Sequence, residues 1–204
     1  HESNKMEETA NLFYEIIQQK GRIFVSGSGH SSLVAQEAYY RAGGLVSIKP
    51  IWLKSLLITE NAEMSTHLER ISGIAEATFN EHQPNNKDCL VLVSNSGRNA
   101  YGIELAIKAK SIGCKTVALT SIQHSSNVES RHSSGMRLYE LCDIVIDSHV
   151  PLGDATMSHP DFKENFGPVS TISTVAIFNA VICRTIEILI ENNQHPEVLK
   201  SANL

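Results

Sequence analysis

The sequence predicts an α/β protein whose parallel sheet is covered by helices on both faces. Three observations lead to this class. Short strand-like runs alternate with segments of helical periodicity, these runs are apolar throughout, and two of them end in loops rich in serine and glycine. A strand buried on both faces is continuously apolar, and parallel neighbours need a helical crossover between them.

The first half of the chain reads as a helix followed by a β-α-β unit. Residues 4–19 carry apolar side chains at the three-to-four spacing of an amphipathic helix, and Gly21 ends it. A β-rich run at 22–26, a helical segment at 31–41 and a second β-rich run at 45–48 follow. The alternation therefore begins at the first strand.

The second half continues the same alternation. Apolar runs bounded by glycine or polar residues predict strands at 89–93, 115–119 and 143–146. Helical periodicity predicts helices at 66–79, 100–112 and 170–191. No low-complexity linker and no repeat of 20 to 50 residues interrupts the chain. We therefore expect a single domain over residues 1–204, with an N-terminal helix at about 4–20.

Composition narrows the classes of partner. The 204 residues are 42% hydrophobic and 19% charged, with a net charge of −5 and no run of lysine or arginine. Such a chain can bury a core, but it lacks the basic surface that collects a phosphate backbone. The richest apolar stretch, 175–190, is interrupted by Asn179, Arg184 and Glu187. Neither nucleic acid nor a membrane is an expected partner.

The cysteine pattern indicates a reducing compartment. Cys89, Cys114, Cys142 and Cys183 are widely separated in apolar segments, without C-x-x-C spacing and without a secretory signal. We expect these four residues to be reduced and buried, and the protein to be cytoplasmic.

Both serine-glycine loops follow predicted strands. SGSGHSS occupies 26–32 and SNSGRN occupies 94–99. Ligands of parallel sheets bind beyond the carboxyl ends of the strands. Glycines allow close approach of the backbone, a helix amino terminus offers free N–H groups, and serine adds hydroxyl donors. The pair of loops favours a phosphate site, whereas either loop alone is equally well explained as a turn and helix cap.

The loops do not fit a nucleotide cofactor. Gly27 and Gly29 begin a dinucleotide fingerprint, but Ser32 holds its third glycine position, and no acidic residue ends the second strand. The chain also lacks a G-x-x-x-x-G-K-[ST] loop, a G-x-S-x-G elbow and an H-E-x-x-H motif. The expected ligand is a small phosphorylated compound, with no cofactor and no metal.

Together with VALTS at 117–121, the two loops resemble the SIS (sugar isomerase) domain. AQEAYYRAGGL, SRHSSGMRLYELCD and GPVSTI further resemble the bacterial UPF0309 group, whose members are often labelled phosphoheptose isomerases. The resemblance implies a three-layer α/β/α sandwich with a five-stranded parallel sheet and a phosphorylated sugar or amino sugar as ligand. It also implies a homodimer or homotetramer with the site near a subunit boundary, and a C-terminal tail that is truncated here.

The resemblance to the SIS domain implies that the two loops form a phosphate site. Its members are Gly27, Ser28, Gly29, His30, Ser31, Ser94, Asn95, Ser96, Gly97, Asn99 and Ser121. Asn99 stands where the S-x-S-G-x-[ST] loop of SIS domains has a hydroxyl, and we expect it to act as donor and helix cap. Arg98 either pairs with the phosphate or faces solvent, and we expect the latter.

Isomerisation through an enediol requires a base and an acid, generally a carboxylate and a histidine. Counting from Ser31, the histidine and glutamate positions of phosphoheptose isomerases fall on Glu37 and Arg41, and the final helix contains no histidine. We predict Glu37 and His67 as catalytic residues. The alternatives are an ion pair of Glu37 with Arg41 at i, i+4 and a solvated surface position for His67.

Two further histidines lie in serine-rich segments on the expected ligand side. His124 and His132 both begin the sequence HSS, and we predict contacts from them to sugar hydroxyls, with chance or capping as the alternative. The predicted function is a sugar-phosphate isomerase. A noncatalytic sugar-phosphate sensor, and an etherase or deglycase acting on an amino-sugar 6-phosphate, remain open alternatives, so whether the protein is an enzyme is undecided at this level.

Overall fold

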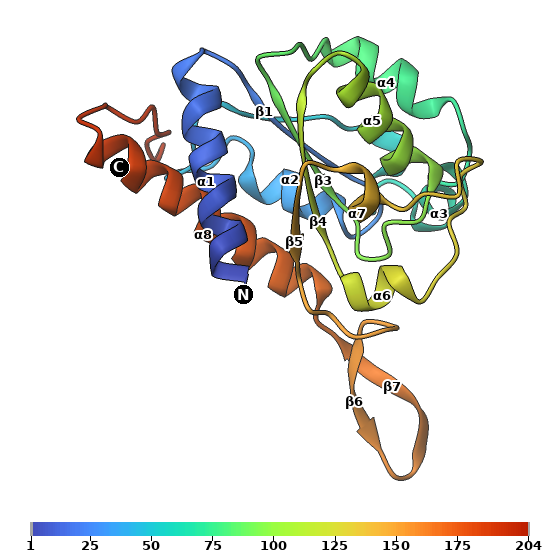
Figure 1. Cartoon of the computed structure of the whole chain (residues 1–204). Coiled ribbons are helices and arrows are strands. Elements are labelled where there is room, and N and C mark those ends of the chain that lie inside the picture. Colours follow the sequence, from blue (N-terminus) through green and yellow to red (C-terminus); the bar gives the residue numbers. More distant parts are fainter. Residues whose placement is uncertain (1, 204) are drawn as a thin grey trace.

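The computed structural model, which describes residues 2–203, contains a five-stranded parallel sheet between two layers of helices (Figure 1). The strand order is β2-β1-β3-β4-β5. The strands are β1 (Ile23–Gly27), β2 (Ile48–Pro50), β3 (Cys89–Val93), β4 (Lys115–Thr120) and β5 (Ile144–Asp147). The predicted class and the five-stranded parallel sheet are confirmed.

One layer consists of α1 (Glu2–Gln18), α2 (Ser32–Ala38) and α8 (Ser170–Glu191), which share a core with one face of the sheet. The other layer is built from α4 (Ile74–His82), α5 (Ala100–Ser111) and α7 (Leu138–Leu141). The 3₁₀ turn η1 (Lys54–Leu56), α3 (Ala62–Leu68) and α6 (Ile122–Ser126) lie in the connections.

The continuous apolar runs follow from this double coverage. In β3, Val91 packs into the core of the first layer, while its neighbours Leu90 and Leu92 pack into the core of the second. All five residues of β3 are buried. Because successive side chains of a strand point to opposite faces, a strand covered on both sides needs apolar residues at every position.

Three expectations from the sequence were wrong. The helix expected at 66–79 is two helices, because Gly73 adopts φ 93° and its N–H donates to the Glu104 carboxylate at 2.8 and 3.1 Å. The second strand lies at 48–50 rather than 45–48. All four cysteines are free, but only Cys89 and Cys114 are buried, whereas Cys142 is partly buried and Cys183 is exposed on α8.

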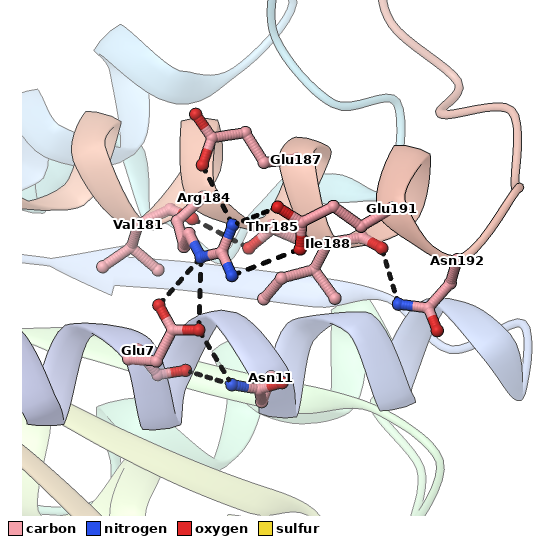
Figure 2. A network of polar contacts seen from close by, with 9 residues as sticks. All are labelled: Glu7, Asn11, Val181, Arg184, Thr185, Glu187, Ile188, Glu191 and Asn192. Carbon is pink, nitrogen blue, oxygen red and sulfur yellow. Dashed lines mark hydrogen bonds and ion pairs between the residues drawn. The ribbon is translucent and has the colours of Figure 1, made fainter.

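Polar contacts tie α8 to α1 on the outside of their packed faces. Arg184 of α8 donates to Glu7 of α1 at 2.8 Å and to Glu187 and Glu191 on its own helix at 3.1 and 2.9 Å (Figure 2). The hydrogen bond that Arg184 donates to Glu7, then those it donates to Glu191 and Glu187, raise the pKa of Arg184. By length and hydropathy α8 could also cross a membrane, yet residues such as Phe178 and Val181 are buried in the core.

An antiparallel hairpin, which the sequence analysis did not predict, projects from the body between β5 and α8 (Figure 1). It consists of β6 (Ala155–His159) and β7 (Phe162–Pro168). Met157, Phe162 and Phe166 on it are 57%, 54% and 42% exposed. The hairpin therefore offers an apolar surface that residues 2–203 do not cover.

Candidate functional site

The strand order brings the two serine-glycine loops side by side. β1 and β3 are hydrogen-bonded neighbours, and the chain leaves β1 toward β2 but leaves β3 toward β4. Their carboxyl ends thus form the switch point at which parallel sheets bind ligands. An open cavity of about 330 Å³ lies here, lined by both loops, by α3 and by the segments before and at the start of α8. The cavity lies where the sequence analysis expected the ligand site.

Gly27 and Gly29 shape the first loop. A Cβ on Gly27 would lie 2.6 Å from the carbonyl oxygen of Ser31, so only glycine lets the turn close onto β1. Gly29 adopts φ 55°, and its N–H donates to Leu56 O at 2.9 Å and to Ser65 Oγ at 3.1 Å. The hydroxyl of Ser31 does not cap α2 and lines the cavity. It is therefore available to a ligand rather than used as a cap.

The second loop leaves backbone donors unused at the start of α5. Gly97 has φ 57°, where a Cβ would lie 2.9 Å from Ser125 Oγ, and its N–H donates to Ser94 Oγ at 3.1 Å. Within residues 2–203 the N–H groups of Ser96, Arg98 and Asn99 have no acceptor. Free N–H groups at a helix amino terminus favour an anion. The loop has the donor set of a phosphate site.

The side chains of two residues expected in the phosphate site have other partners. Asn99 does not cap α5, because its Oδ1 accepts from Arg131 Nη1 at 3.0 Å. Ser121 is fully buried outside the cavity, since its hydroxyl donates to Val150 O at 2.5 Å and accepts from His124 N–H at 3.0 Å. Ser121 therefore caps α6 and orients His124 instead of contacting a ligand.

Glu69 is the carboxylate that the sequence analysis missed. It lines the cavity and accepts a hydrogen bond from the hydroxyl of Ser28. Its carbonyl accepts from Tyr101 N–H at 3.0 Å, which fixes the segment after α3 against the start of α5. Expecting one long helix at 66–79 hid this residue, because Glu69 is the C-terminal cap of α3 rather than part of a solvated helical face.

His124 lies on the other side of the second loop. In the orientation of the Asn95 amide that places Nδ2 3.1 Å from His124 Nδ1, the amide donates to Nδ1, and this assignment puts the ring proton on Nε2. Burial, aided by the nearby charge of Arg98, lowers the pKa of His124 against the opposing effect of Asp154. His124 lines the cavity as a neutral imidazole, in agreement with its expected place on the ligand side.

Asp154 connects the cavity to the long helix α8. It accepts from the N–H groups of Val169 and Ser170 at 3.0 and 2.7 Å and from the Ser170 hydroxyl at 2.6 Å. Burial acts to raise the pKa of Asp154, but these hydrogen bonds outweigh it and lower the pKa. Asp154 and Ser170 both line the cavity, although the sequence analysis named neither as a site residue.

Outside the phosphate loops, three further predicted residues, the two catalytic candidates and His132, also lie away from this cavity. Glu37 forms an ion pair with Arg41 and lines a separate hollow beside α8. His67 is exposed on α3, and Thr66 of that helix and its C-terminal cap Glu69 line the cavity in its place. His132 lies by α5, with Nε2 3.7 Å from Glu104 and Nδ1 2.9 Å from Ser134 Oγ. The sequence gives the positions of these residues along the chain but not the side on which they face.

The described residues place no group of three histidines, cysteines or acids in a geometry that could hold a metal. His30 is exposed at the rim and lines the cavity with Ser28 and Ser31. The cavity therefore presents hydroxyls, backbone N–H groups, the carboxylates of Glu69 and Asp154, and the imidazoles of His30 and His124.

A parallel sheet with paired serine-glycine loops at its switch point is the architecture of a phosphosugar-binding class of α/β domains, and the model of the SIS domain family matches residues 1–121. The chain belongs to the SIS domain family, and within it to the UPF0309 group. It is 39% identical over 204 residues to the UPF0309 protein GK1441 of Geobacillus kaustophilus, covering 100% of this chain and 81% of that protein. A UPF0309 protein of Streptomyces griseus is 37% identical over 205 residues, with 100% and 82% covered.

Solved structures support the same fold. The phosphoheptose isomerase GmhA from Neisseria gonorrhoeae superimposes with a TM-score of 0.58 at 17% identity, covering 90% of this chain and 86% of that one. The NanR protein of Vibrio vulnificus, solved in complex with ManNAc-6P, gives a TM-score of 0.53 at 19% identity, with 91% and 56% covered. The fold thus occurs both in an isomerase and in a protein solved with a bound sugar phosphate.

Proposed function

We propose that this protein binds a phosphorylated sugar in the cavity and isomerises it between aldose and ketose. The observation that carries the proposal is the set of unused donors at the switch point. The N–H groups of Ser96, Arg98 and Asn99 have no acceptor within residues 2–203, and the cavity is lined by Ser31 and Ser96. These donors suit the three oxygens of a phosphate. A cavity of about 330 Å³ leaves room for a sugar beside it.

The acid and base of the reaction are Glu69 and His124. Glu69 is held by Ser28 after β1 and His124 follows β4, so they flank the β3 loop that takes the phosphate. Glu69 removes the proton from the carbon next to the carbonyl and returns it to the neighbouring carbon. The Nε2–H of His124 donates to the oxygen that becomes the enediol hydroxyl, and the ring regains its proton when the new carbonyl forms.

Ligand-induced stabilisation tests phosphate binding. In a thermal-shift panel, one sugar phosphate at 100 times its dissociation constant will add about 2.7 kcal/mol of stability, whereas its unphosphorylated counterpart will not. Ser96→Ala will weaken binding by roughly tenfold, because it removes one donor to a charged group. Ser111→Ala, at the opposite end of α5, is the matched control. An equal shift with sugars lacking phosphate would contradict the proposal.

Association into a homodimer is part of the proposal, and the hairpin supports it. A two-stranded hairpin is marginally stable alone in water, and this one exposes Met157, Phe162 and Phe166. Sedimentation velocity at micromolar concentration will show a dimer or larger species, and Phe162→Asp will shift it toward monomer. A parent protein that sediments as a monomer would count against this part.

A further inference from the structure

Three of the seven arginines differ from the rest in having no ionic partner. Arg22, Arg41, Arg137 and Arg184 each form an ion pair with an acid. Among residues 2–203, Arg70, Arg98 and Arg131 form none. Guanidinium groups without a carboxylate partner are free to bind an anion from outside the chain.

Hydrogen bonds bring the segments carrying these three arginines together. The N–H of Arg131 donates to the carbonyl of Arg98 at 2.8 Å, which joins the segment after α6 to the β3 loop. The N–H of Tyr101 donates to the carbonyl of Glu69 at 3.0 Å, which joins the residue before Arg70 to the start of α5. We name Arg70, Arg98 and Arg131 the arginine cluster.

Electrostatics and burial agree with this grouping. Burial, and then the like charges of Arg98 and Arg70, lower the pKa of Arg131, while the nearby Glu69 opposes them. The Nε of Arg98 is buried and has no hydrogen-bond partner, so Arg98 does not simply face solvent as expected from the sequence. A buried donor without an acceptor is costly, and an incoming anion removes that cost.

The arginine cluster borders the cavity, although only Arg98 belongs to one of the two serine-glycine loops. Arg131 Nη1 donates to Asn99 Oδ1 at 3.0 Å, and Asn99 lines the cavity. Glu69, which precedes Arg70, lines it as well. The carboxylate of Glu69 accepts a hydrogen bond from Ser28. Within the described residues it forms no ion pair with any of these arginines. Three positive charges therefore lie beside a site that already offers its own hydrogen-bond donors to a phosphate.

We propose that the arginine cluster binds a second anionic group, a carboxylate or a second phosphate, on the same sugar phosphate that occupies the cavity. This inference rests on the proposed function and names its substrate class, which is a sugar phosphate with two separated anionic groups. The β3 loop takes one phosphate through neutral donors, and the arginines take the other group through charge-assisted hydrogen bonds.

Two matched ligand pairs test the inference by calorimetric titration. N-acetylglucosamine 6-phosphate and N-acetylmuramic acid 6-phosphate differ by one carboxylate-bearing ether, and fructose 6-phosphate and fructose 1,6-bisphosphate differ by one phosphate. We expect the second anion of at least one pair to tighten binding by roughly tenfold or more, and the pair that responds tells carboxylate from phosphate. The gain will shrink as salt is raised from about 0.05 to 0.5 M.

Variants of the arginine cluster show which residues provide this gain in affinity. Arg70→Gln and Arg131→Gln, both at exposed positions, will each remove most of it and will change binding of the monoanionic partner by about twofold or less. Lys115→Gln removes the same charge at the amino end of β4, at the opposite end of the strands from the cavity, and will keep the gain in affinity. If the second anion adds nothing in either pair, or if its gain survives in both arginine variants, the inference is overturned. Failure of the monoanionic ligands to bind at all would instead overturn the phosphate site.

Discussion

Glu69→Gln will abolish exchange of the carbon-bound proton of the bound sugar phosphate with solvent while leaving ligand binding nearly unchanged. Glutamine keeps the size of the side chain and an oxygen that accepts from Ser28, but it cannot take a proton. A positioned base contributes roughly 10²- to 10⁴-fold, so the exchange rate will fall by about this factor. Deuterium incorporation from heavy water, followed by proton NMR, measures it directly.

Substitutions of two other glutamates serve as comparisons for the Glu69→Gln variant. Glu81→Gln lies at an exposed position of α4 and is the control for loss of one negative charge. Glu37→Gln is the competing variant, because the sequence favoured Glu37 while the structure pairs it with Arg41 outside the cavity. Loss of exchange in Glu37→Gln but not in Glu69→Gln would reverse our assignment. If the parent protein binds a sugar phosphate without any exchange, the noncatalytic sensor is the correct function.

Gly27→Ala will both destabilise the fold and disable the phosphate site. The added Cβ would lie 2.6 Å from the carbonyl oxygen and 2.7 Å from the carbonyl carbon of Ser31, so the backbone of the first loop has to move. We expect a loss of about 1–3 kcal/mol in the free energy of unfolding, as for overpacking elsewhere. Displacing Ser28 and Ser31 will weaken ligand binding on the order of 100-fold. Urea denaturation and titration with the ligand measure the two effects separately.

Gly102→Ala is the matched control for this substitution. Gly102 lies within α5, where a Cβ would meet nothing within 4 Å. Alanine in a helix is more favourable than glycine by about 0.5–1 kcal/mol, so this variant will be slightly more stable and will bind normally. If Gly27→Ala were as stable as the parent and bound the ligand equally well, the close contact between β1 and the Ser31 turn would be unimportant to the site.

The sequence alone determined the class of fold, the number of parallel strands through the resemblance it carries, and the location of the two serine-glycine loops. Strands buried on both faces have to be apolar at every position, as β3 is, and this pattern is visible without coordinates. The glycines of the two loops, and the serines beside them, likewise signal a ligand at the ends of strands. These features are local, so periodicity and composition are enough to find them.

Only the tertiary structure decided which charged side chains belong to the site. The sequence favoured Glu37, but a helix that ends at Leu68 and a hydrogen bond from Ser28 bring Glu69 into the cavity instead. Ser121 looked like a ligand donor, yet burial commits its hydroxyl to Val150 and to the turn that holds His124. These outcomes depend on contacts between segments far apart in the chain, which no local pattern records.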